Sequence, residues 1–137
     1  MAHDVTVENY GTGVVVALSG VITGDDLIKT NQHIYAIDPH KILRYQIWDF
    51  TQVEILDITT EAIQKLVWQD MQEAHANSNQ SVAIIGSKAT LQGIDSIYRY
   101  LSDCWVRTGF QSKSFSNMDD ARHWIASLSS AKIQMRL

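Results

Sequence analysis

The hydrophobic pattern of this chain switches repeatedly between strand-like alternation and helical stripes, and this feature constrains the fold more than any other. Strand-like stretches are expected at residues 5–10, 14–18, 43–50, 81–86 and 113–115. Helical stripes follow the second strand-like stretch and every later one. Strands that alternate with helices predict an α/β layer fold. We therefore expect a single mixed, mostly parallel sheet of four to five strands with four helices.

The helices are expected near residues 24–38, 60–76, 91–105 and 117–128, each from apolar positions that recur with helical spacing. Gly11-Thr12-Gly13 separates the first two strands by a short turn, which predicts an antiparallel hairpin. The stretch 82–85 is wholly apolar, as is typical of a strand covered on both faces. We expect it at the centre of the sheet.

Length and charge narrow the class of protein. A chain of 137 residues predicts one domain over 1–137, in which 130–137 is a C-terminal tail without a predicted element. The net charge of −4 argues against a nucleic-acid-binding protein, which usually carries a basic face. The longest apolar run, 14–18, is far shorter than a transmembrane segment. With one cysteine, Cys104, an internal disulfide is impossible, and we expect a cytoplasmic protein.

No catalytic, cofactor or metal signature emerges from the residues. Gly86-Ser87-Lys88 follows a strand as a phosphate loop does, but the second glycine of that motif is missing. No two of the five histidines have the i,i+4 spacing of a helical zinc site, and a second cysteine ligand does not exist. We expect no cofactor, no metal and no enzymatic activity, because no acid–base or nucleophile set can be assembled.

Three stretches together resemble the SpoIIAA-like family, within the wider group of sulphate-transporter and anti-sigma-factor-antagonist (STAS) domains. They are residues 18–26, LSGVITGDD; residues 47–60, with Ile47-Trp48-Asp49-Phe50 and Asp57-Ile58-Thr59-Thr60; and residues 115–125, FSNMDDARHWI. The resemblance spans nearly the whole chain. It implies a compact α/β domain that acts as a regulator or a binding module.

The resemblance also points to one turn as the regulatory site. In the anti-sigma antagonists a Ser or Thr is phosphorylated in an Asp-Ser-Ser/Thr-Gly turn at the start of the second main helix. Here the matching turn is Asp57-Ile58-Thr59-Thr60, in which Asp57 and Thr59 match. Ile58 replaces the small hydroxyl residue and Thr60 replaces glycine. The alternative from the residues alone is that Asp57 or Thr59 is simply an N-cap of the helix.

Two functional hypotheses remain open. The first is a non-enzymatic regulatory or protein-interaction module whose partner is another protein or a second copy of this chain in a homodimer. Trp68, at the edge of its helical stripe, is the candidate for the partner surface, with a core position as the alternative. The second hypothesis is a carrier or sensor of a small apolar or lipid-like ligand held between the helices and the sheet.

Overall fold

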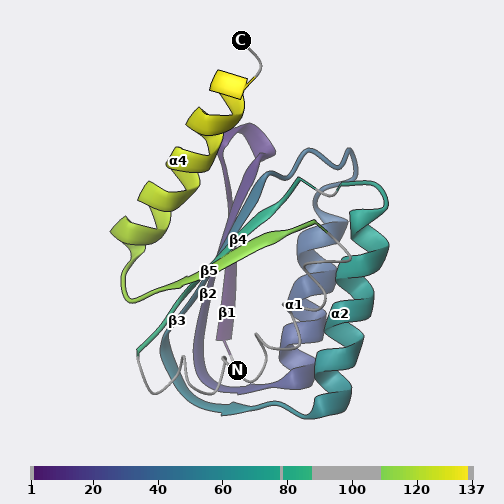
Figure 1. The fold of residues 1–137 in the computed structure, drawn as a ribbon. Helices are drawn as coiled ribbons and strands as arrows, with labels where there is room; N and C mark the ends of the chain where they lie inside the picture. Colours follow the sequence, from purple (N-terminus) through teal and green to yellow (C-terminus); the bar gives the residue numbers. More distant parts are fainter. Residues whose placement is uncertain (1, 78, 88–108, 136–137) are drawn as a thin grey trace.

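Five strands form one sheet in the computed structural model, which describes residues 2–77, 79–87 and 109–135. Figure 1 shows the strands side by side between helices. The strands are β1 (Ala2–Glu8), β2 (Gly13–Thr23), β3 (Tyr45–Asp57), β4 (Ser81–Ile85) and β5 (Gln111–Phe115). Their order in the sheet is β1-β2-β3-β4-β5.

The sheet is mixed, as the sequence predicts. β1 and β2 form an antiparallel pair, whereas β2–β3, β3–β4 and β4–β5 are parallel. The expected place of residues 82–85 inside the sheet is confirmed, because β4 lies between β3 and the edge strand β5, one strand from the middle. β4 is paired on both sides. An apolar strand needs cover on both faces, and that condition does not require the middle position.

The described residues contain three α-helices rather than the expected four. They are α1 (Gly24–Ala36), α2 (Thr60–Ala74) and α4 (Met118–Met135). The helix expected at 91–105, with Cys104, lies outside the described residues. α4 runs to Met135, so a helix occupies most of the segment 130–137 for which no element was expected. No helix in the described ranges is long and apolar enough to cross a membrane.

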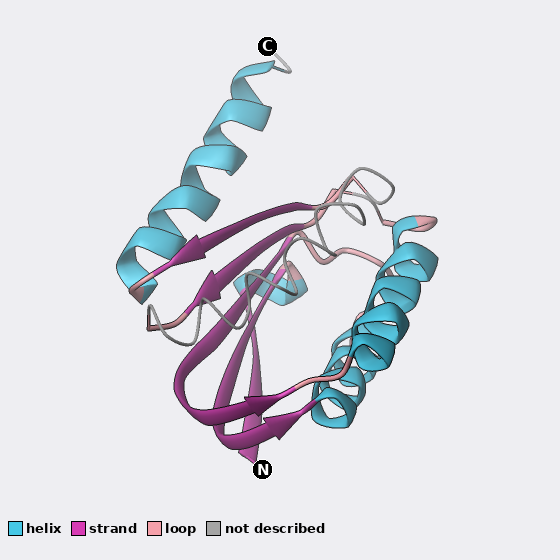
Figure 2. Ribbon diagram, turned by 60° about the horizontal axis from the view of Figure 1, so that its bottom comes forward, coloured by secondary structure: helices cyan, strands magenta, loops and turns pink. Residues whose placement is uncertain are grey.

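Helices cover both faces of the sheet. α1 and α2 lie next to each other on one face, and α4 lies on the other (Figure 2). Because side chains of a strand alternate between faces, one set of strand residues meets α1 and α2 and the other meets α4. The first layer contains Val14, Val16, Leu18, Trp48, Phe50 and Ile84, and the second contains Tyr45, Ile47, Ala83 and Ile85.

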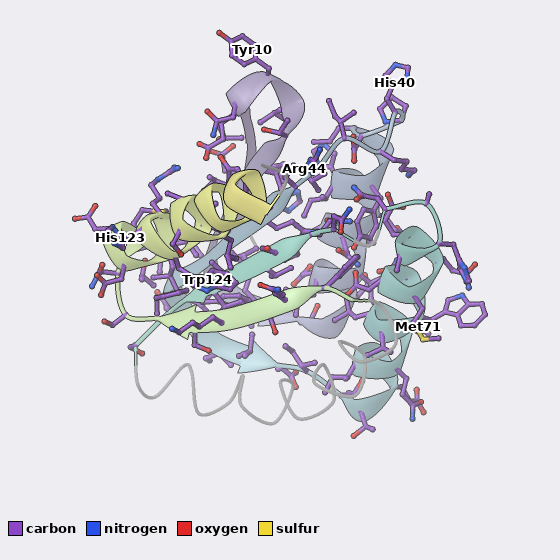
Figure 3. All side chains as sticks on the ribbon, turned by 45° about the horizontal axis from the view of Figure 1, so that its top comes forward. Tyr10, His40, Arg44, Met71, His123 and Trp124 are labelled. Carbon is purple, nitrogen blue, oxygen red and sulfur yellow. The ribbon has the colours of Figure 1, made fainter. Side chains whose placement is uncertain are left out.

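Two departures from the predicted strand boundaries have a backbone cause. β2 continues five residues beyond its predicted end because Gly20 adopts a φ of 77° beside a register shift, and this bulge lets the strand go on to Thr23. β1 ends at Glu8 instead of Tyr10, because Asn9–Gly11 forms a 3-10 turn with positive φ values. Tyr10 projects from the tip of this turn into solvent (Figure 3).

Candidate functional site

The predicted regulatory turn lies where two strand ends and two helix starts meet. β2 and β3 end at paired residues, since Thr23 is the register partner of Asp57. α1 begins directly after Thr23, and α2 begins at Thr60, two residues after Ile58. The two helix N-termini therefore lie side by side at one edge of the sheet. Each presents unpaired backbone N–H groups and partial positive charge.

Thr59 is the N-cap of α2. Its Oγ1 accepts a hydrogen bond from the backbone N–H of Ala62 at 3.2 Å, and its backbone is extended with φ −87° and ψ 160°. The turn faces solvent, because Asp57, Thr59 and Thr60 are exposed. Ile58 is the exception, since it packs against the core beneath α1 and α2. Its apolar side chain anchors the turn, which gives a physical reason for an isoleucine at this position.

The first turn of α1 brings negative charge to the same edge. Thr23 and Asp26 form a capping box, in which Asp26 accepts from the Thr23 N–H at 2.9 Å and Thr23 Oγ1 accepts from the Asp26 N–H at 3.2 Å. The backbone hydrogen bond from Thr23 is the main reason that the pKa of Asp26 is lowered. Asp25 and Glu61 add further carboxylates to the two first turns. A phosphate at this edge would meet helix dipoles that favour it and carboxylates that oppose it.

A glycine and an alanine hold the two helix starts together. A Cβ atom at Gly24 would come within 2.2 Å of the Ala62 Cβ and within 3.8 Å of Ile58 Cγ2. Gly24 is buried and Ala62 is 8% exposed. The start of α1 thus packs directly on the first turn of α2, beside the Thr59 turn.

The candidate partner residue Trp68 lies two turns further along α2. Its side chain is 62% exposed. Met71, one turn later, lies on the outer side of α2 (Figure 3). The turn and Trp68 share one helix, although no contact in the structure brings them together. Exposure makes Trp68 available to a partner and does not identify one.

A polar cluster between α1 and α2 is absent from the sequence-based predictions. The Tyr35 hydroxyl donates to Asp70 Oδ1 at 2.5 Å, and Asn31 Nδ2 donates to the same oxygen at 3.2 Å. Asn31 also donates to Gln69 Oε1 at 3.1 Å. One turn after Asp70, Glu73 is buried and pairs with Lys41 from the loop after α1.

Burial raises the pKa values of Asp70 and Tyr35 in this cluster. It raises the pKa of Asp70 to about 6, although the hydrogen bonds from Tyr35 and Asn31 act in the opposite direction. The negative charge of Glu73 raises the pKa of Asp70 further. Burial also raises the pKa of Tyr35 well above its ordinary value, and the Asp70 carboxylate beside it adds to the effect. A carboxyl group that titrates near neutral pH therefore joins the two helices.

The helical stripe itself contains the signal that could have revealed this cluster. Ile63 and Leu66 lie on the face of α2 that packs against the sheet, and Asp70 and Glu73 continue the same i, i+3, i+7, i+10 series. A carboxylate on an apolar stripe indicates burial with a partner. No group of three or more His, Cys, Asp or Glu in the described part of the chain could hold a metal ion.

Comparison with known proteins identifies the fold. No protein-family model and no curated protein matches the sequence. An uncharacterised protein of the DUF3478 family from Shewanella loihica PV-4, described as having a SpoIIAA-like fold, matches with a TM-score of 0.59 at 14% identity, over 90% of this chain and 92% of that chain.

Two structures of SpoIIAA match as well. The anti-sigma factor antagonist SpoIIAA in its unphosphorylated form gives a TM-score of 0.55 at 12% identity, over 96% of this chain and 98% of that chain. The Bacillus cell fate determinant SpoIIAA in the phosphorylated form gives 0.52 at 14% identity, over 90% and 99%. The chain therefore has a SpoIIAA-like fold, which confirms the resemblance seen in the sequence.

Proposed function

We propose that this chain is a non-enzymatic regulatory module of the STAS type, which binds a protein partner through the start and outer face of α2. The observation that carries the proposal is the exposed Thr59 hydroxyl at the N-terminus of α2, on a SpoIIAA-like fold, in the turn that resembles the anti-sigma antagonist site. One of the matching structures is of SpoIIAA in a phosphorylated form, so charge added to a protein of this fold has a precedent. We keep the prediction of a cytoplasmic location from the sequence.

Substitutions at Thr59 separate a regulatory hydroxyl from a helix cap. Thr59→Ala should lower the free energy of unfolding by about 1 kcal/mol, because only the hydrogen bond to the Ala62 N–H is lost. Thr59→Glu should in addition change the affinity for a purified partner at least about tenfold, since it places a charge where a phosphate would lie. Thr6→Glu, at an exposed position on β1 outside the proposed surface, is the matched control. Unchanged partner affinity in Thr59→Glu would exclude the switch.

Trp68 tests the second part of the proposed surface. Because its side chain is 62% exposed, Trp68→Ala should change the free energy of unfolding by no more than about 0.5 kcal/mol. The same change should weaken partner binding about tenfold or more, as expected for an aromatic anchor at an interface. Val7→Ala, also exposed but on β1 outside the proposed surface, is the control. Titration with a second labelled copy of this chain tests the predicted homodimer in the same assay, and equal affinities in all variants would remove Trp68 from the surface.

The alternative function, a carrier of a small apolar ligand, stays a prediction from the sequence. No observation on the described residues favours it over a regulatory module. A native mass spectrum of the purified chain distinguishes the two, because a carrier would retain a ligand mass and a regulatory module would not.

A further inference from the structure

Two carboxylates and one cation occupy the interface between α1 and α2. Asp70 and Glu73 are one turn apart on the same face of α2, and both face α1 or the loop after it. Lys41 Nζ lies 2.8 Å from Glu73 Oε1 and 3.0 Å from Oε2, so the lysine is engaged by Glu73. Asp70 receives hydrogen bonds from neutral donors and has no cation of its own among the described residues.

The polar and charged groups around Asp70 come from α1, α2 and β3 in the described part of the chain. α1 contributes Asn31 and Tyr35, and α2 contributes Gln69 and Glu73. β3 contributes Gln46, which is neutral and lowers the pKa of Tyr35 through a side-chain hydrogen bond. The only group in this set with a full charge is therefore another carboxylate, Glu73, and its own charge is already paired with a lysine.

We propose that Asp70, Tyr35 and Asn31 form a proton-operated clasp between α1 and α2, closed when Asp70 is protonated and loosened when it is ionised. The neutral form of Asp70 is favoured between the helices because the carboxyl group loses water there, and this effect outweighs the hydrogen bonds that Tyr35 and Asn31 donate to Oδ1, which favour the ionised form. An ionised Asp70 lies beside the negative charge of Glu73, and no cation contacts it among the described residues.

The direction of the pH effect follows from linkage. The pKa of Asp70 is about 6 with the helices closed and close to 3.8 in an open chain, so closing the clasp takes up a proton between these pH values. The closed state is therefore favoured fully below this window and loses that advantage as the pH rises through about 6. α2 also carries the Thr59 turn and Trp68. The clasp stands independently of the proposed function, because it concerns only the opening of the helix pair.

Hydrogen exchange of the full chain measures this opening directly. After correction for the chemical exchange rate, the opening equilibrium of amides in α1 and α2 should rise about tenfold between about pH 5 and about pH 7.5, since each pKa unit of linkage is worth a factor of ten. Amides of the β1–β2 hairpin should not show the same rise. In Asp70→Asn the rise should disappear. A pH-independent opening in the wild-type chain, or an unchanged rise in Asp70→Asn, would overturn the clasp.

Two neighbouring variants should shift the midpoint of this pH dependence in opposite directions, which a purely structural role of Asp70 would not produce. Tyr35→Phe removes a hydrogen bond that lowers the pKa of Asp70, so the midpoint should move up. Glu73→Gln removes a charge that raises it, so the midpoint should move down. Tyr45→Phe is the matched control, because Tyr45 donates to the carboxylate of Glu8 at 2.5 Å elsewhere in the molecule.

Carbon-13 NMR of the Asp70 side chain gives the same midpoint without relying on the Asp70→Asn variant. The titration is recorded in the wild-type chain, Tyr35→Phe and Glu73→Gln. A wild-type midpoint near that of an ordinary aspartate, or shifts of Tyr35→Phe and Glu73→Gln in the same direction, would refute the proposal.

Discussion

Lys41→Met is expected to lower the free energy of unfolding by about 3 kcal/mol, one of the two largest effects we predict for a single substitution in this chain. Glu73 is 8% exposed, and the lysine supplies the charge that faces its carboxylate. Methionine keeps much of the length of the side chain and removes only that charge. We place the cost at the lower end of the range for broken buried pairs, because the Lys41 side chain is 32% exposed.

The geometry of the pair explains why its loss is costly. Lys41 donates to Glu73 Oε2, whereas Oε1, at 2.8 Å from the same nitrogen, has no hydrogen-bond donor in the described part of the chain and is held by charge alone. Without Lys41 both carboxylate oxygens would be buried without a partner.

The double variant Lys41→Met/Glu73→Leu tests whether Lys41→Met loses stability through the missing charge or through a change in the loop backbone. It should regain most of the stability, because a buried ion pair replaced by apolar residues leaves no uncompensated charge. Urea unfolding of the wild-type chain, both single variants and the double variant measures the coupling. If the double variant is as unstable as Lys41→Met alone, the cost comes from the loop backbone, in which Lys41 has a φ of 56°.

The sequence predicts the layer architecture of this chain because the spacing of apolar residues along a strand or helix is a local property. The apolar run at 14–18 predicts a buried strand, the stripe around Ile63 predicts the buried side of a helix, and both expectations agree with the structure. The N-caps are equally local: Thr59 and Asn117 cap α2 and α4 through hydrogen bonds to N–H groups three residues later. Such contacts depend only on neighbours in the chain.

Strand order and the polar cluster could not be predicted, because both depend on contacts between distant residues. The spacing of apolar residues does not give strand order, so it could not show that β3, and not β4, takes the middle of the sheet. Tyr35 and Asp70 are 35 residues apart, and only the parallel β2–α1–β3–α2 arrangement brings them within 2.5 Å. A tyrosine near one stripe and an aspartate near another carry no information about each other until the helices are paired.

Gly24→Ala is expected to cost about 3 kcal/mol, at the upper end of the effects usual for overpacking. The added methyl carbon would lie 2.2 Å from the Ala62 Cβ, so one of the two helix starts has to move. Neither methyl group can rotate away, because a Cβ atom is fixed by its backbone. The better helix propensity of alanine offsets only part of this cost.

The rescue by a second substitution gives this prediction its sharpest test. Ala62→Gly removes the atom that collides, so Gly24→Ala/Ala62→Gly should be about 2 kcal/mol more stable than the sum of the two single effects predicts. Gly20→Ala is the control: its Cβ would meet nothing within 4 Å, and its cost comes from the backbone φ of 77°, which Ala62→Gly cannot relieve. Urea unfolding of the six chains measures both couplings. A positive coupling only at Gly24 would show that the start of α1 contacts Ala62, whose N–H donates to Thr59, and equal couplings at Gly20 and Gly24 would exclude this contact as the cause.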